Sequence, residues 1–297
     1  MDAMVDWQLA SKVAEGVAAL QPSGDPKPFQ AVAGPAEESA RLVSAYTGLV
    51  AESLPAAEAV DRAAWVDANL QSMRGILDPA ARKATERMGP LGGVVGSAAG
   101  AVLGVEAGAI SGFLAGRVLG QYEFPVLDPA APARLLFVAP NLGHAATQLD
   151  SDADRLLRWV ALHESTHALQ FGGVPWLREH LADLVRELTG ALDLDPGKLF
   201  GSLPGLDDLP SLRTAMQRRR RDRSGLLRVL ERLIGMDLKM RQYEQGKAFC
   251  DGVVARGGIE ALNRVWDGPD AMPSIAELDD PAGWLARTEQ RRLRQSA

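Results

Sequence analysis

The sequence predicts a mainly α-helical protein with one short β element beside the helix that carries its most informative motif. Apolar residues recur at three- and four-residue steps, the spacing of an amphipathic helix, in four segments: 5–20, 36–53, 57–74 and 79–88. Residues 135–139 are instead rich in β-formers and lie between two prolines, which favours a short strand with an exposed edge. Between the first two helices, the proline, glycine and polar residues of 21–35 predict a loop.

The size and charge of the chain limit its organisation and its partners. With 297 residues we expect one domain over 1–297, divided into a helical part, 1–130, and a part that carries the motif, 131–297. A net charge of −6 argues against nucleic acid and anionic membranes as partners. The single cysteine, Cys250, permits no intramolecular disulfide, and the acidic N-terminus lacks the pattern of a signal peptide. We therefore expect a cytoplasmic protein.

Residues 89–120 form a segment dense in glycine and alanine. A membrane hairpin would use such small residues for close helix contact, and the segment is long enough to span a bilayer. Against this, Glu106 lies in its middle, and glycine at this density weakens an isolated helix. We expect tightly packed helices, buried in the core or in a contact between two copies of the chain.

The most informative motif is His163-Glu164-Ser165-Thr166-His167. Residues four apart stand on the same face of a helix, so His163 and His167 can present two imidazoles to one Zn²⁺ ion. Glu164 is rotated by about 100° from His163, which suits a general base beside a metal-bound water. The alternative is a helix whose histidines have ordinary hydrogen-bond partners. Before the motif, Asp150, Asp152 and Asp154 have the spacing of a calcium loop but lack its later residues, so helix capping is favoured.

A catalytic zinc site requires a third protein ligand and an open fourth position. Six residues beyond His167 stands Gly173, where one family of zinc peptidases has a third histidine, so the ligand must lie elsewhere. The candidates are His180, Asp183, Glu187, Glu231, Glu244 and Asp251. We favour Glu244 as the ligand and Asp251, two helical turns later, as a partner that orients a ligand histidine.

Three further side chains are candidates for the rim of the site. His180 is the second choice as a ligand, although a histidine beside the cleft is its more common state. His144 would flank the cleft as a hydrogen-bond donor, and Tyr243 stands next to Glu244. The last two also have an ordinary interpretation: His144 as a loop histidine without a role in the site, and Tyr243 as a core residue.

Five segments together resemble a known family: LGQYEFPVL (119–127), LLFVAPNL (135–142), WVALHESTHALQFGGVPWLREHL (159–181), MRQYEQGKAFCDGVV (240–254) and LNRVW (262–266). They are similar to the zincin-like metallopeptidase type 2 family, in particular to a bacterial branch named for its association with deazaflavin coenzyme biosynthesis. The resemblance runs from residue 5 to residue 287. It implies a mostly helical zincin-like fold, with zinc held by His163 and His167 and with Glu164 as the base. It is also compatible with Glu244 as a ligand.

These observations predict a zinc-dependent hydrolase, peptidase-like, in which Glu164 activates a metal-bound water. The exposed edge expected at 135–139 would align an extended substrate by strand addition. The alternative is a non-catalytic protein that keeps the zincin fold for metal binding, structure or interaction. The sequence names no substrate.

Overall fold

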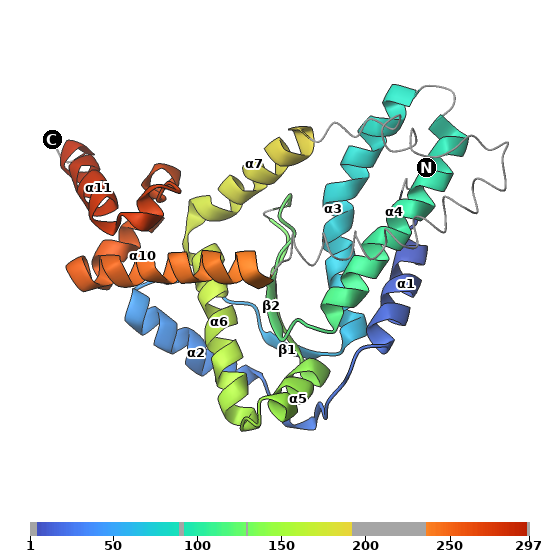
Figure 1. Cartoon of the computed structure of the whole chain (residues 1–297), viewed down its shortest axis with the longest axis horizontal. Helices are drawn as coiled ribbons and strands as arrows, with labels where there is room; N and C mark the ends of the chain where they lie inside the picture. Colours follow the sequence, from blue (N-terminus) through green and yellow to red (C-terminus); the bar gives the residue numbers. More distant parts are fainter. Residues whose placement is uncertain (1–4, 89–91, 129, 192–235, 296–297) are drawn as a thin grey trace. The chain divides into compact units, whose positions relative to one another are not determined.

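The computed structural model describes residues 5–88, 92–128, 130–191 and 236–295 (Figure 1). Contacts divide the chain into two compact units, Met1–Leu194 and Asp195–Ala297. The first unit contains the motif, a small sheet and the helices around it. The described residues of the second form two long helices joined by short helical turns. The expectation of one domain over 1–297 stays a prediction.

A three-stranded sheet lies at the centre of the first unit. Its strands are β1 (Ala57–Val60), β2 (Gly120–Glu123) and β3 (Arg134–Val138), in the order β1-β3-β2. Strand β1 pairs parallel to β3, and β2 pairs antiparallel to it. The predicted strand therefore exists, but the prediction of an exposed edge there is wrong, because β3 has a neighbour on both sides. The edges belong to β1 and β2.

The prediction of a helix over 57–74 is also wrong for its first four residues. Residues 57–60 form β1, whose register with β3 runs from Ala57 opposite Leu135 to Val60 opposite Val138. This pairing joins segments far apart in the sequence, and such tertiary contacts override a local helical pattern. The helix begins only afterwards, as α3 (Arg62–Met88), with the side chain of Asp61 accepting from the N–H of Ala64. It continues through Pro79 and so unites two predicted helices.

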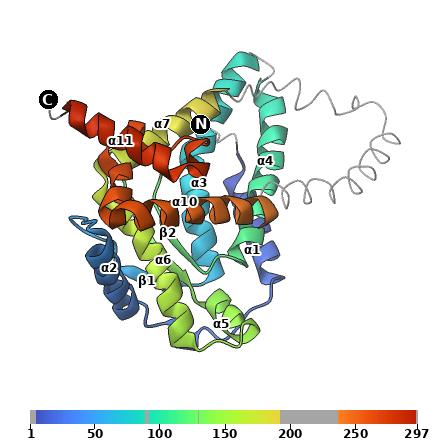
Figure 2. The ribbon, with the colours of Figure 1, turned by 60° about the vertical axis from the view of Figure 1, so that its left-hand side comes forward.

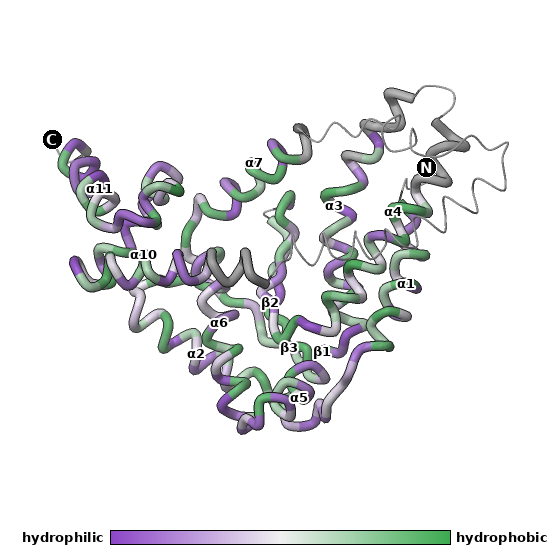
Figure 3. Tube along the Cα trace, viewed as in Figure 1, coloured by the Kyte–Doolittle hydropathy of each residue, from purple (hydrophilic) through white to green (hydrophobic). Residues whose placement is uncertain are grey.

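Helices cover both faces of the sheet, as Figures 1 and 2 show. Leu136 and Val138 of β3 pack against α1 (Trp7–Ala19), α3 and α4 (Gly92–Ala115). Leu135 and Phe137, which point the other way, pack among α2 (Ala33–Thr47), α5 (Ala139–Gln148) and α6 (Ala153–Gly173). Figure 3 shows the hydrophobic colour of β3 between these layers. The motif lies on α6, which is held against the second face.

The glycine-rich segment packs inside the chain. A Cβ atom at Gly104, Gly108 or Gly112 would lie 2.3–2.4 Å from a backbone oxygen of α1 or of its cap, so the two helices touch through their backbones. The contacted residues are Asp6, Ala10 and Ala14, which share the four-residue spacing of the glycines. The expectation of tightly packed helices is confirmed for α4. Association of copies through 89–120 stays a prediction. In the described parts of the chain, no helix has both the length and the apolar character of a membrane span.

Asn141 joins three elements of the first unit. Its amide nitrogen donates to the carbonyls of Ala115 and Val118, each at 2.7 Å, and its amide oxygen accepts from Nε of Arg62 at 2.7 Å. Asn141 is 3% exposed, and burial lowers the pKa of Arg62. The network fixes the end of α4 to the start of α5.

Replacing Asn141 with alanine is expected to lower the free energy of unfolding by about 2 kcal/mol, because a buried carbonyl, a partly buried carbonyl and a guanidinium N–H would lose their partner. Urea unfolding of the purified variant measures this loss. An unfolding free energy equal to that of the wild type would show that water replaces the amide without cost.

The second unit contains α10 (Met236–Leu262) and α11 (Pro281–Gln295). A small core of Phe249, Val253, Ala261 and Trp284 holds them together. The sequence of paired glycines at 257 and 258 predicts a break in the helix, and Gly258, with a φ of 75°, does interrupt α10. The helical pattern of residues 211–241 also predicts a helix, but this segment falls mainly outside the described residues.

Candidate metal centre

The helix that carries the motif has a defined start and a defined buried face. The carboxylate of Asp152 accepts from the N–H of Arg155 at 3.0 Å and caps α6, so the capping prediction is confirmed. Apolar residues at helical spacing turn one face of α6 toward the sheet; they are Leu156, Leu157, Val160, Ala161, Ala168 and Leu169. As a result, His163 lies on the opposite, exposed face and His167 at its margin.

The two histidine rings converge. Nε2 of His163 lies 3.3 Å from Nε2 of His167, with the ring planes at 89° to each other. Two nitrogens bound to one tetrahedral Zn²⁺ at about 2.0–2.1 Å stand about 3.3–3.4 Å apart, so the pair fits a common ion. Partial burial and the neighbouring His167 lower the pKa of His163, which favours the neutral ring that a metal requires.

His167 has a hydrogen-bond partner on its other nitrogen. The amide oxygen of Gln170, three residues later on α6, lies 3.2 Å from Nδ1 of His167. On the opposite side of the pair, the ring of Trp159 stacks on that of His163, with centroids 6.2 Å apart. The two rings are therefore supported by residues of the same helix.

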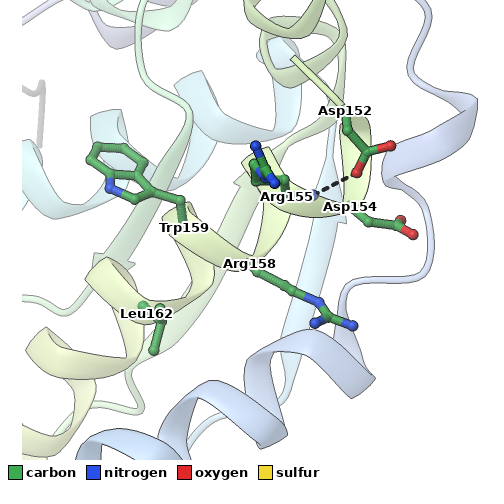
Figure 4. A pocket seen from close by; sticks show the side chains of 6 residues that line it. All are labelled: Asp152, Asp154, Arg155, Arg158, Trp159 and Leu162. Carbon is green, nitrogen blue, oxygen red and sulfur yellow. Dashed lines mark hydrogen bonds between the residues drawn. The ribbon is translucent and has the colours of Figure 1, made fainter.

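A shallow depression of about 350 Å³ lies along the first half of α6 (Figure 4). Its lining comprises Asp152, Asp154, Arg155, Arg158, Trp159 and Leu162. Neither motif histidine lines it, so the depression lies beside the candidate metal centre and does not contain it.

Glu164 is held between α6 and β2. Its side chain is 6% exposed, and Oε2 accepts from the backbone N–H of Tyr122 at 2.9 Å. A Cβ atom at Gly120 would lie 2.8 Å from Cγ of Glu164, so only glycine leaves room for the carboxylate here. Burial raises the pKa of Glu164 to about 7, although the N–H of Tyr122 favours the ionised form.

An aromatic cluster fixes β2 beyond the motif. Tyr122 stacks on Phe171 of α6, and Phe124 lies 4.9 Å from the same ring. Arg178 of α7 (Pro175–Ala191) donates to the hydroxyl of Tyr122 and lies over Phe124 at 4.9 Å. Strand β2, which supplies the N–H for Glu164, is therefore tied to both α6 and α7.

The other candidates are not gathered around the two histidines within the first unit. His180 lies on α7 against Trp176, with ring centroids 5.6 Å apart. Asp183 pairs with Arg186, Glu187 is exposed, and His144 is half-buried on α5. Among the described residues of that unit, no third histidine, cysteine or carboxylate side chain completes a ligand group.

The remaining candidates belong to the second unit. Glu244 and Tyr243 are exposed on α10, and Asp251 pairs with Lys247 at 2.5 Å. Glu231 lies outside the described residues. The third ligand and its supporting residues stay predictions.

Comparison with known proteins gives the family of the chain and agrees with its fold. The family model described as zincin-like metallopeptidase matches residues 5–208 and 201–285. The chain belongs to the zincin-like metallopeptidase family. A crystal structure from Chloroflexus aurantiacus, described as "a putative hydrolase with a novel fold", is 27% identical, with a TM-score of 0.65. The match covers 96% of this chain and 99% of that one. A search of the curated proteins gives no match.

The predicted fold class is thus confirmed: this member of the zincin-like metallopeptidase family is mainly α-helical, with a short sheet beside the motif helix. Two parts of its site were not predicted. The position of Gln170, three residues after a candidate ligand, was a readable signal, since side chains at this spacing meet on a helix. The contact of Tyr122 and Gly120 with Glu164 has no local signal, because it joins segments about forty residues apart through tertiary packing.

The buried carboxylate predicts a pH dependence for the metal-free protein. Because the pKa of Glu164 rises from 4.5 to about 7 on folding, the folded state binds its proton more tightly. The protonated side chain therefore makes its full contribution to the free energy of unfolding below about pH 4.5, and this contribution is lost as the pH rises through 7. Over this pH range the wild type should lose about 2–3 kcal/mol of unfolding free energy, and Glu164→Gln should not show this loss. Urea unfolding with a chelator at several pH values measures it.

The matched control is Glu38→Gln, which alters an exposed carboxylate of α2. We expect the difference in stability between Glu164→Gln and the wild type to grow from pH 5 to pH 8, and that of the control to stay constant. Parallel curves for all three proteins would mean that Glu164 ionises in the folded state as it does in the unfolded chain.

Proposed function

We propose that this protein is a zinc-dependent hydrolase that acts on peptide-like substrates. The observation that carries the proposal is the 3.3 Å separation of the two Nε2 atoms, which matches two ligands of one tetrahedral ion. Membership of the zincin-like metallopeptidase family supports the same chemistry. We infer that His163 and His167 hold the ion, and that Glu244 supplies the third ligand.

Zn²⁺ bound there would supply a Lewis acid that polarises a carbonyl and lowers the pKa of a water molecule. Glu164 would accept the proton of that water and return it to the leaving group. In the metal-free protein, burial raises the pKa of Glu164 to about 7, and a base works best when its pKa lies near the working pH. The N–H of Tyr122 keeps one carboxylate oxygen in place, so the side chain does not have to be ordered during the reaction.

Strand β2 supports the choice of an extended substrate. It is an edge of the sheet, and Leu119, just before it, accepts from the N–H of Val138 on β3. Hydrogen bonding alternates along a strand, so the N–H of Tyr122 points away from β3, where it reaches Glu164. The outer edge of β2 therefore runs beside the base. A peptide added to this edge would pass the carboxylate, and strand addition is a common mode of peptide binding.

One observation favours a second candidate, a non-catalytic protein. The distance of 3.3 Å between the Nε2 atoms also suits a hydrogen bond between two neutral imidazoles. In that case the motif would stabilise α6 without a reaction.

Cleavage of a peptide library by the zinc-loaded protein, followed by mass spectrometry, separates the two candidates. We expect cleavage that a chelator abolishes and that added zinc restores, and none with His163→Ala. Zinc bound at one ion per chain without any cleavage would support the non-catalytic candidate. Failure of the wild type to bind zinc would contradict the proposed function.

A further inference from the structure

We propose that Gln170 is a positioning residue that sets the tautomer of His167 and so prepares its Nε2 atom for the metal. This inference rests on the proposed function, since it concerns the same ion. It starts from the distance of 3.2 Å between the amide oxygen of Gln170 and Nδ1 of His167.

The chemistry of the two groups determines where the proton lies. A neutral imidazole carries one N–H, on either Nδ1 or Nε2, and an amide oxygen can only accept a hydrogen bond. The contact with Gln170 therefore favours the proton on Nδ1. Nε2 then carries the lone pair that a metal requires, and it is the atom that faces Nε2 of His163 at 3.3 Å.

The position of Gln170 on α6 makes this contact rigid. Residues three apart on a helix are neighbours on its surface, so no change in the loops is needed to form it. Gln170 is half-buried and follows two buried residues, Ala168 and Leu169, of which Ala168 belongs to the core cluster on this face of the sheet. Its side chain is therefore held close to the ring that it orients.

The two histidines differ in the contacts that their Nδ1 atoms make. For His163, the contacts that the structure gives are the stack on Trp159 and the meeting of the Nε2 atoms; neither involves its Nδ1. Of the two rings, only that of His167 has a protein acceptor at Nδ1 among the described residues. We infer that His167 enters the metal site already in the binding tautomer, whereas His163 adapts when the ion binds. Partners of this kind change metal affinity by about 10–100-fold in other sites.

Three variants test the inference. Gln170→Met keeps the length of the side chain and removes the acceptor, and Gln170→Glu keeps an acceptor. Gln148→Met, at the exposed end of α5, is the matched control. Zinc affinity is measured by competition with a chelator of known affinity. The tautomer of His167 is read from the ¹⁵N resonances of its ring in the metal-free protein at about pH 8, where an unperturbed imidazole is neutral.

We expect Gln170→Met to weaken zinc binding about tenfold or more and to give a mixture of tautomers at His167. Gln170→Glu should restore the single tautomer and bind zinc at least as tightly as the wild type, and the control should change neither. A single tautomer with unchanged zinc affinity in Gln170→Met would overturn the inference and leave the proposed function intact. If the wild type binds no zinc, the proposed function fails, and the ring resonances still decide whether Gln170 sets the tautomer.

Discussion

Glu164→Gln is expected to slow zinc-dependent hydrolysis by about 10²–10⁴-fold, the usual contribution of a general base. Glutamine has nearly the same shape, and its amide oxygen can still accept from the N–H of Tyr122, so the contact between α6 and β2 is kept. It cannot accept a proton from water. Because Glu164 is not proposed as a ligand, zinc should remain bound at the wild-type stoichiometry. Steady-state rates and the zinc content of the same preparation give both quantities.

The same measurements on Glu38→Gln provide the control, because this exposed carboxylate of α2 lies outside the motif. Its rate and zinc content should equal those of the wild type. A Glu164→Gln variant that keeps zinc and hydrolyses at the wild-type rate would exclude Glu164 as the base. Loss of zinc together with activity would instead place Glu164 among the groups that hold the ion.

Gly108→Leu is expected to lower the free energy of unfolding by about 3 kcal/mol or more, a large part of the stability of an ordinary domain. A Cβ atom at this position would lie 2.3 Å from the backbone oxygen of Ala10 and 2.9 Å from Cβ of Val13. Neither atom is the end of a flexible side chain, so α1 and α4 would have to move apart. Their separation would expose the core on one face of the sheet.

Gly16→Leu introduces the same side chain at a helical glycine of α1 where no atom lies within 4 Å of the added Cβ. We expect this control to be as stable as the wild type or slightly more stable, since leucine favours a helix by close to 1 kcal/mol relative to glycine. Thermal and urea unfolding compare the pair. Equal stability of the two variants would mean that α4 does not pack on α1 through its glycine face.

Local patterns in the sequence are enough to predict most of the helices. The residues of 5–20 give α1, and the polar spacing before the motif gives the cap of α6 by Asp152. Strand β3 was recognised from its own β-forming residues. Its central position was not, because that depends on β1, whose residues 57–60 carry no strand signal of their own. The local pattern therefore gave the wrong structure where a segment pairs with a distant strand.

In the site, too, local sequence predicts some features, and tertiary packing determines the others. Two histidines four apart on a helix converge for reasons of helical geometry alone, so His163 and His167 were predictable. The environment of Glu164 was not, since the N–H of Tyr122 and the space left by Gly120 come from β2. The third ligand has no local signal either, because carboxylates at helical spacing occur on many surface helices. Glu244 is the proposal that the sequence best supports.

Anomalous scattering at the zinc absorption edge locates the ion directly, in crystals of the protein loaded with one equivalent of zinc. We expect one peak, about 2.0–2.1 Å from both Nε2 of His163 and Nε2 of His167. A peak bound to only one of these rings, or a peak elsewhere with the two rings still in contact, would contradict it.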